Sequence, residues 1–591
     1  MKLVLRWFAV IPLLSALMLA QSSSPASPAV DNSKAPAGIT EQDVKELRDA
    51  LAAQQQQIAA QQQQIKKQQQ MLERLNQALQ QNPAASHQPE PKQAAAQPVH
   101  QPPSLGQVAS TTPMLPAGSA AQPRPLPAPN AQVSANPETQ HPSVSPLSFR
   151  IGNTEFAPGG FADFTTFFRS TNVGSGIGTS FGGIPYSNSI PGQLTETRFS
   201  AQNSRVALKV TGALGENKFT GYVEADFLGF LPNNAHVTSN SDSQRLRLYW
   251  VDVTRGKWEF LGGQSWSFLT PNRKGLSPMP SDIFYSQDMD TNYQVGLTWT
   301  RAPQFRIIYH PDQHWAMGVA LENPEQYTGS SSVNVFPSNL SAYSTQFDTG
   351  SGIPSGVTGA APGTGTPNVA PDILPKIAYD TDIGGKHMHV EAVGVARFFK
   401  AFDPVFASST STSVVGGTHY TAVGGGGSVN ANLELFKNFH LIANSYYSDG
   451  GGRYIFGLAP DLVVRPNGSL APLHSGSGIG GFEWQVTPKT MIYSYYGGMY
   501  VQRYYFPDPN SKAKAKYSGY GFPGSSSSAN RDVQEATFGI IQTLWKNEHY
   551  GALQLITQGS YLSRSPWSVA TGAPKNAHLG MGYVDLRYVL P

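Results

Sequence analysis

The chain has 591 residues, with 41 Lys plus Arg, 38 Asp plus Glu and no cysteine. Only 13% of its residues are charged, about half of the roughly 25% that is usual for a soluble domain. This composition excludes a disulfide framework and a thiolate metal site, and a net charge of +3 is too small to argue for nucleic acid. After Trp7 and Phe8 no aromatic residue occurs before Phe149. The chain therefore has an aromatic-poor N-terminal part and an aromatic-rich remainder.

Residues 1–22 have the pattern of a secretory signal peptide. Lys2 and Arg6 precede a short, mostly apolar run at residues 7–20 (WFAVIPLLSALMLA), and small polar residues follow it. The run is shorter than the roughly 18 residues that a spanning helix needs. We therefore predict an exported chain, cleaved after Ala20 or Ser22, with a polar spacer at residues 23–40.

Residues 41–82 predict a helical coiled coil. A 3.5-residue apolar repeat is typical of a left-handed coiled coil, and no Gly or Pro interrupts residues 41–81. The a positions are all aliphatic: Val44, Leu51, Ile58, Ile65, Leu72 and Leu79. The alternative is a disordered Gln-rich tract, because three of the d positions are Gln. Since such a narrow apolar stripe cannot bury itself alone, the pattern implies oligomerisation.

Residues 83–147 predict a disordered linker. They are rich in Pro, Ala and Gln and contain no Phe, Trp or Tyr. Such a segment cannot bury enough apolar area to offset the entropy lost on ordering.

From residue 148 to residue 591 the hydrophobic period is two, which predicts an all-β transmembrane antiparallel barrel. The clearest run is Asn292–Thr300 (NYQVGLTWT), and His314–Glu322 and the last strand alternate in the same way. About seventeen such runs occur. A barrel with both termini in the periplasm needs an even number, so we predict 16 strands and expect one run to be wrong. The alternative is a soluble sandwich or propeller, but no repeat of about 40 residues is present.

The connections alternate between short and long, as in porins. Arg301–Pro303 and Pro311–Gln313 are predicted short turns. The long excursions are predicted at residues 323–371, 402–427 and 508–531. The polar segment Leu269–Asp290 either folds into the lumen and narrows it or forms an exposed loop.

Charged residues on the strands indicate a water-filled pore. We expect Leu246, Leu248 and Trp250 to face lipid, so Arg245 and Arg247 face the lumen. Rings of Arg or Lys in a pore select anions. These groups either set a transverse field or pair with one another and stiffen the wall. The predicted pore-lining residues are Arg198, Arg205, Glu224, Asp226, Arg245, Arg247, Arg273 and Lys274. Arg198 and Arg205 have odd spacing, so both face inward only if a bulge intervenes.

Other motifs predict no catalysis, no cofactor and no metal ion. Residues 178–182 (GTSFG) match the letters of a nucleophile elbow but lack the helix that must follow it. His387, His389 and Glu391 alternate on one face, a pattern more typical of a lumen lining than of a metal site. We predict that the protein is not an enzyme.

Four stretches resemble DcaP-like outer-membrane porins: residues 198–210 (RFSAQNSRVALKV), 219–227 (FTGYVEADF), 245–249 (RLRLY) and 262–268 (GGQSWSF). The order of export signal, coiled coil, linker and barrel is also similar. The resemblance implies a trimeric, sixteen-stranded outer-membrane porin for small anionic solutes such as dicarboxylates. The terminal Val589-Leu590-Pro591, in place of a final aromatic residue, departs from the family pattern.

Several functions therefore remain open. The first is passive diffusion of small hydrophilic, anionic solutes through a homotrimer in the outer-membrane lipid, and a carbohydrate porin is its main rival. The second is a barrel-anchored structural or adhesion protein, with the periplasmic coiled coil bound to peptidoglycan or to another periplasmic protein.

Overall fold

The computed structural model describes residues 146–229, 239–240, 242–340, 343, 346–349, 368–408, 411, 413–511 and 516–591. The predicted signal peptide, spacer, coiled coil and almost all of the linker lie outside these residues. No helix within the described ranges is long and apolar enough to cross a membrane.

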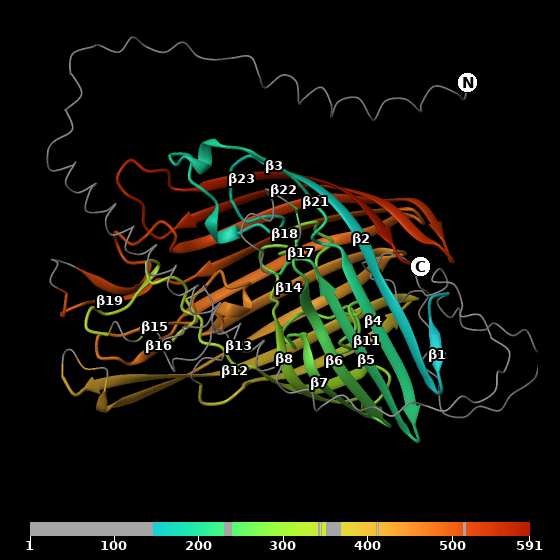
Figure 1. Cartoon of the computed structure of the whole chain (residues 1–591), viewed down its shortest axis with the longest axis horizontal. Coiled ribbons are helices and arrows are strands. Elements are labelled where there is room, and N and C mark those ends of the chain that lie inside the picture. The colour runs from blue at the N-terminus through green and yellow to red at the C-terminus, as the bar shows by residue number, and fades with distance from the viewer. Residues whose placement is uncertain are drawn as a thin grey trace, which may run out of the picture. The chain divides into compact units, whose positions relative to one another are not determined.

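The described residues form a closed antiparallel barrel (Figure 1). Of the eighteen paired segments, β1 (Phe149–Ile151) only flanks the start of β2, while β3 and β4 pair with successive parts of β2 and form one interrupted strand. The sixteen strands are β2 (Thr154–Arg169), β3 with β4 (Glu196–Ser200, Arg205–Leu214), β5 (Asn217–Asp226), β6 (Arg245–Arg255), β7 (Trp258–Trp266), β8 (Arg301–Tyr309), β9 (Trp315–Glu322), β11 (Asp372–Ile383), β12 (Lys386–Phe406), β13 (Val414–Phe436), β14 (Phe439–Asp449), β17 (His474–Thr487), β18 (Thr490–Val501), β21 (Asn530–Asn547), β22 (Gly551–Pro566) and β23 (Ala577–Val589). Pairing of β23 with β2 closes the barrel, which confirms the predicted antiparallel barrel and its strand number.

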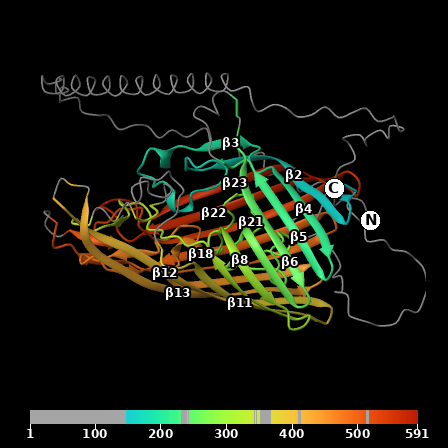
Figure 2. The ribbon, with the colours of Figure 1, turned by 60° about the horizontal axis from the view of Figure 1, so that its bottom comes forward.

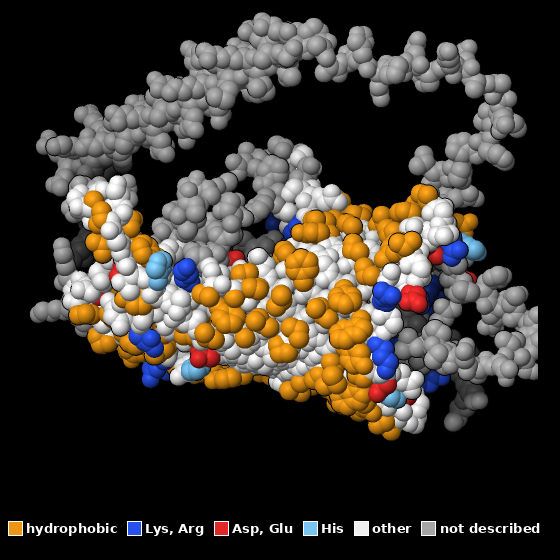
Figure 3. Space-filling view, turned by 90° about the horizontal axis from the view of Figure 1, so that it is seen from below, with side chains coloured by type: hydrophobic (Ala, Val, Ile, Leu, Met, Phe, Trp, Pro, Cys, Tyr) orange, Lys and Arg blue, Asp and Glu red, His pale blue; other side chains and the backbone are white. Residues whose placement is uncertain are grey.

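The two faces of the wall differ as a membrane barrel requires. In β9 the outward side chains Trp315, Met317, Val319 and Leu321 are 38–44% exposed, whereas the inward Ala320 and Glu322 are fully buried. Figure 3 shows hydrophobic side chains over the middle of one outer face, with charged side chains towards its ends. Outward strand positions are therefore mainly apolar, whereas charged strand residues such as Glu322 point into the barrel.

Short turns gather at one end of the barrel and long connections at the other. The short turns are residues 215–216, 256–257, 310–314, 384–385, 437–438, 488–489 and 548–550. The long connections carry the small strands β10 (Asn334–Val335), β15 (Leu462–Val464), β16 (Leu470–Pro472), β19 (Tyr504–Pro507) and β20 (Tyr517–Tyr520), and the 3-10 turns η1 (Phe181–Gly183), η2 (Pro191–Gln193) and η4 (Gly452–Tyr454). Short turns at one end and long loops at the other are typical of outer-membrane barrels.

Two predicted connections are wrong. Arg301–Pro303 is not a turn but the start of β8, and much of residues 402–427 is not a loop, because β12 runs to Phe406 and β13 begins at Val414. These two strands, with 21 and 23 residues, form a long hairpin along the lower side of the barrel in Figure 2. Alternation near the loop ends is weak because small residues such as Gly416 and Gly417 carry no side-chain signal.

The run Asn292–Thr300 is the one predicted strand that is wrong. Its backbone turns at Tyr293 and Gly296, whose φ angles are +63° and +97°, and such angles are incompatible with a β-strand. The side chains of Tyr293, Val295, Leu297 and Trp299 are all buried. The run lies inside the barrel, within the connection between β7 and β8.

Candidate functional site: the constricted lumen

The connection between β7 and β8, residues 267–300, folds into the barrel, and we call it the lumenal segment. Its donors bond inward-facing acceptors on four strands: Asn272 to Glu391 of β12 (3.1 Å), Arg273 to Glu483 of β17 (2.8 Å), Met289 to Gln558 of β22 (2.7 Å) and Val295 to Glu535 of β21 (2.8 Å). The sequence left open whether Leu269–Asp290 folds into the lumen or forms an exposed loop, and in the structure it folds into the lumen. The lumenal segment crosses the lumen and narrows it.

Glycine allows the segment to approach the wall closely. Gly296, with its positive φ, lies against the backbone carbonyl of Gly478 in β17, and a Cβ atom there would overlap that oxygen. In the neighbouring strand β18, a Cβ atom on Gly497 would overlap the carbonyl oxygen of Val295. Backbone therefore packs directly on backbone at this contact, as only glycine permits.

A basic cluster lies on β4 to β8. Arg247 donates to Glu224 (2.5 Å) and to Asp226 (2.7 Å), and Arg245 makes two bonds to Asp226 (3.0 and 2.7 Å). Arg205 reaches Glu224 only at 3.8 Å. The predicted residues on these strands thus meet in one network, with both arginines of β6 paired.

Arg301 adds a fourth guanidinium that sequence reasoning missed. It lies about 5 Å from the ring centres of Trp266 and Trp299, and its Nη1 has no hydrogen-bond partner among the described residues. It is within electrostatic reach of Arg245 and Arg247. The basic cluster, defined as Arg205, Arg245, Arg247 and Arg301, therefore sets four guanidiniums against the two carboxylates of Glu224 and Asp226. No alternation marks Arg301 as inward-facing, because the sequence predicts a turn at Arg301–Pro303.

A β-bulge in β6 corrects the predicted faces of that strand. Glu224 pairs with Leu248 and Ala225 pairs with Leu246, so Arg247 is an extra residue. Leu246 faces out, 48% exposed, but Leu248 and Trp250 are buried and face in, contrary to prediction. The bulge lets Arg247 and Leu248 both lie on the inside. A strict period of two cannot reveal such an insertion.

A second irregularity brings Arg198 and Arg205 to the same side. Residues 201–204 interrupt the strand between β3 and β4. Phe199 and Val206 are exposed on the outer face, so Arg198 and Arg205, their neighbours, point inward. The odd spacing of Arg198 and Arg205 required a bulge for both to face inward, and this interruption provides it.

Arg273 and Lys274 have different surroundings. Arg273 makes a bidentate pair with the buried Glu483, and its charge is neutralised there. Lys274 is exposed, beside Gly275, whose amide donates to Asp380 of β11 (3.0 Å). Only Lys274 of these two is available to solvent.

His389 and Glu391 take part in ion pairs. His389 lies between Asp380 (2.9 Å) and Glu391 (3.2 Å), and Lys376 donates to Glu391 (2.9 Å). His387 contacts Asp380 and Asp382. These ion pairs lie within β11 and β12, and the lumenal segment is bound to them through the bonds from Asn272 to Glu391 and from Gly275 to Asp380.

A small cavity lies between the lumenal segment and the wall of β2, β4 and β23. Its volume is about 30 Å³, room for roughly two water molecules. Five lining residues have a buried polar atom without a hydrogen-bond partner among the described residues: Asn203 Oδ1, Arg205 Nε, Gln287 Oε1, Asp288 Oδ1 and Arg587 Nε. Buried polar atoms normally have partners, so this cavity is suited to a polar occupant.

Arg587 and Asn203 were not among the predicted pore residues. Alternation in the last strand does place Arg587 opposite Val584, Leu586 and Tyr588, and this signal identifies it as inward-facing. Asn203 had no such signal, because it lies in the interruption between β3 and β4. The closeness of both to Arg205 depends on the pairing of β2 with both β4 and β23.

No protein-family model and no curated protein sequence matches the chain. The barrel is similar to the solved structure of the outer membrane channel DcaP of Acinetobacter baumannii, with 16% identity over 75% of this chain and 99% of that chain and a TM-score of 0.51. An anion-selective porin from Comamonas acidovorans matches 74% of this chain and 99% of its own at 11% identity, with a TM-score of 0.39. OprB of Pseudomonas putida matches 73% of this chain and 94% of its own at 12% identity, with a TM-score of 0.40. The first similarity confirms the fold that the sequence resemblance implied.

Proposed function

We propose that this protein is an outer-membrane porin, through which small hydrophilic solutes diffuse passively, with a preference for anions of the dicarboxylate type. The observation that carries the preference is the local surplus of guanidinium groups in the basic cluster on β4 to β8. Four arginines of the basic cluster face two carboxylates, and Arg205 retains an unpartnered Nε in the cavity beside the lumenal segment.

Arginine is suited to this role because it stays charged at any working pH. Its field acts over a Debye length of about 8–10 Å at ordinary salt, so a charge surplus at a constriction acts on every passing ion. Basic residues in a pore favour anions. We further propose that the protein is a homotrimer, with its short turns and N-terminal coiled coil in the periplasm.

The pairing of the arginines decides which substitution tests the proposal best. Arg247 is buried between Glu224 and Asp226, so its removal also leaves two carboxylates short of a partner. Arg205 has one distant ion-pair partner and lines the cavity. Arg205→Gln therefore changes the charge of the constriction with the smaller structural effect.

The first experiment is conductance of the full chain in planar bilayers. Stepwise currents support the channel, and steps in threes support the trimer. A protein that inserts but never conducts would instead be a barrel-anchored structural or adhesion protein.

The second experiment is the reversal potential in a KCl gradient. We expect an anion preference that falls in Arg205→Gln, most strongly at low salt, while current persists. Arg245→Gln combined with Arg247→Gln should also lower the preference. Lys489→Gln, in an exposed short turn, is the matched control and should change nothing. A wild-type protein without ion preference would favour neutral solutes such as sugars.

A further inference from the structure

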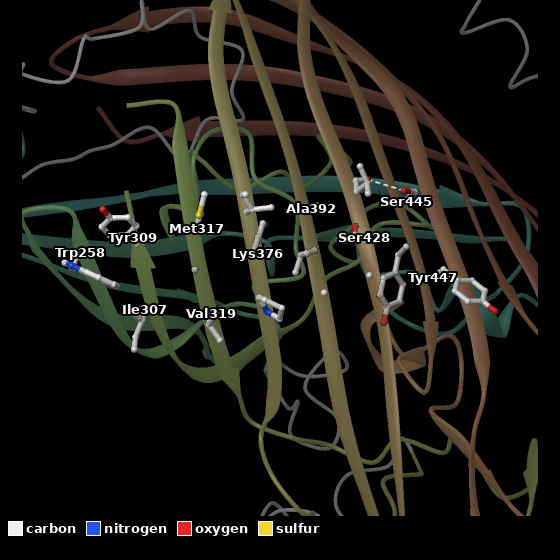
Figure 4. A pocket seen from close by; sticks show the side chains of 18 residues that line it. Trp258, Ile307, Tyr309, Met317, Val319, Lys376, Ala392, Ser428, Ser445 and Tyr447 are labelled. Atoms are coloured by element: carbon white, nitrogen blue, oxygen red, sulfur yellow. Dashed lines mark hydrogen bonds between the residues drawn. The ribbon is translucent and has the colours of Figure 1, made fainter. Parts of the chain in front are cut away.

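The outer wall of the barrel carries an apolar groove on the side opposite to the closure of β2 with β23. It crosses β7 to β14 and has a volume of about 950 Å³ (Figure 4). It follows two neighbouring rows of outward-facing residues along the hydrogen-bonding direction of the sheet. One row begins at Trp258 and Tyr309, passes Ile377 and Ala392, and ends at Ser445. Six strand spacings give a length of roughly 29 Å.

Missing side chains form the hollow. Where the rows cross β12 and β13, the outward residues are Ala392 and Val429 in one row and Gly394 and Gly427 in the other, and the two glycines are direct cross-strand partners. The floor there is mostly backbone whose polar groups belong to the sheet ladder. The hydroxyl of Ser445 donates to the carbonyl oxygen of Val429 (3.1 Å), so it offers no free donor (Figure 4). The groove is therefore suited to hydrocarbon.

The groove opens at the short-turn edge of the barrel, where the chemistry changes. Trp258 and Tyr309 are the terminal residues of β7 and β8, and their ring centres are 4.8 Å apart. Beside them lie Arg255, the last residue of β6, and the exposed Lys257 of the adjacent turn. The Arg255 side chain is 66% exposed and forms a solvent-exposed ion pair with Glu216 (3.4 Å). Aromatic rings and basic side chains at one level are typical of a lipid headgroup interface.

We propose that this groove binds the acyl chains of a phospholipid from the leaflet on the short-turn side, with the lipid phosphate at Arg255 and Lys257. Lipid tails gain no hydrophobic free energy by leaving other tails, so hydrophobicity alone does not favour a lipid in the groove over one in the bulk bilayer. Van der Waals contact with the groove and attraction between the phosphate and the basic side chains provide that preference. A second barrel fits less well, since its outer wall is convex and would leave the groove unfilled. The proposal rests on membrane insertion but not on conduction.

The test uses the full chain reconstituted in vesicles of phosphatidylcholine with a small fraction of phosphatidylglycerol that carries a photoreactive acyl chain. Cross-linked peptides are mapped by mass spectrometry. We expect cross-links concentrated on β11 to β14. Gly394→Leu should reduce them about fivefold or more by filling the groove, and Ala392→Leu is a second filling variant should the first fold poorly. Ala162→Leu, on the exposed outer face of β2, is the matched control.

The headgroup contact is tested separately. Arg255→Gln combined with Lys257→Gln should lower the cross-linking of phosphatidylglycerol on the order of tenfold, since each basic residue near a membrane surface adds attraction for anionic lipid. Photoreactive phosphatidylcholine should be affected less.

Two outcomes overturn the proposal while the protein still inserts and conducts. Cross-links spread evenly over the outer face, unchanged by the filling variants, mean an unselective lipid layer. Disulfide formation between copies through Gly394→Cys means that a second copy covers the groove. A protein that fails to insert at all overturns the proposed function as well.

Discussion

β9 and the run Asn292–Thr300 have the same alternation in sequence and different positions in the structure. In β9 the large apolar side chains face outward and the backbone pairs with β8 and β11. In Asn292–Thr300 they are buried inside the barrel, and apart from a bridge of Trp299 to Ile455 the run pairs with no strand in the described ranges. Alternation therefore predicts which side chains are sheltered from water, but not whether lipid or protein shelters them. The following predictions test that distinction.

The largest effect is expected where the lumenal segment is anchored. Glu483→Gln leaves the buried guanidinium of Arg273 without its ion-pair partner, which typically costs about 3–5 kcal/mol. We expect a lower free energy of unfolding in urea, or a displaced segment with larger single-channel conductance. Glu155→Gln, which breaks the exposed pair with Arg150, should cost no more than about 1 kcal/mol. Equal costs for the two variants would mean that Arg273 does not anchor the segment.

A charge introduced on the outer face of β9 tests whether lipid surrounds the apolar side chains of this strand. Val319→Arg should lower the free energy of unfolding from lipid vesicles by about 2–4 kcal/mol, because its side chain faces the apolar band. Trp315→Arg, at the strand end near the interface, should cost about 0–1 kcal/mol. If both variants lower the free energy of unfolding equally, the cost of a charge on this face does not depend on its depth in the membrane.

The glycine contact between the segment and the wall gives a smaller effect. Gly497→Ala places a methyl group against the carbonyl of Val295 and should cost about 1–3 kcal/mol through overpacking. Its neighbour Gly498 faces outward with ordinary contact distances, so Gly498→Ala should be nearly neutral. Unfolding midpoints and channel conductance measure both. An unchanged Gly497→Ala protein would show that the segment can move away from this wall.

No effect on the barrel is expected from deletion of residues 41–82. The apolar outer face of the barrel can supply the subunit interface, and a 65-residue linker at 83–147 separates the coil from it. Size and conductance steps of the inserted protein measure its oligomeric state. A deletion variant that inserts only as monomers would make the coiled coil the device of trimerisation.

Most strands of the barrel wall can be predicted from the sequence, because the alternation of their side chains is a local pattern. Adjacent residues of a strand must face lipid and lumen in turn, and sixteen of the seventeen alternating runs correspond to strands of the barrel. Inward positions for Arg245, Arg205 and Glu224 follow from the same rule. The rule fails where one residue is inserted, as at Arg247, or where the strand is interrupted, as between Ser200 and Arg205.

The constriction was decided by tertiary structure alone. The lumenal segment lies inside because its donors find Glu391, Glu483 and Glu535, which are far apart in sequence and meet only when the barrel closes. The same closure brings Arg587 of the last strand beside Arg205 of β4. Sequence by itself determined the barrel and the inward position of charged residues such as Arg245 and Glu224, since both depend on side-chain period and type. Which arginines are paired depends on contacts across the lumen, and no local pattern encodes them.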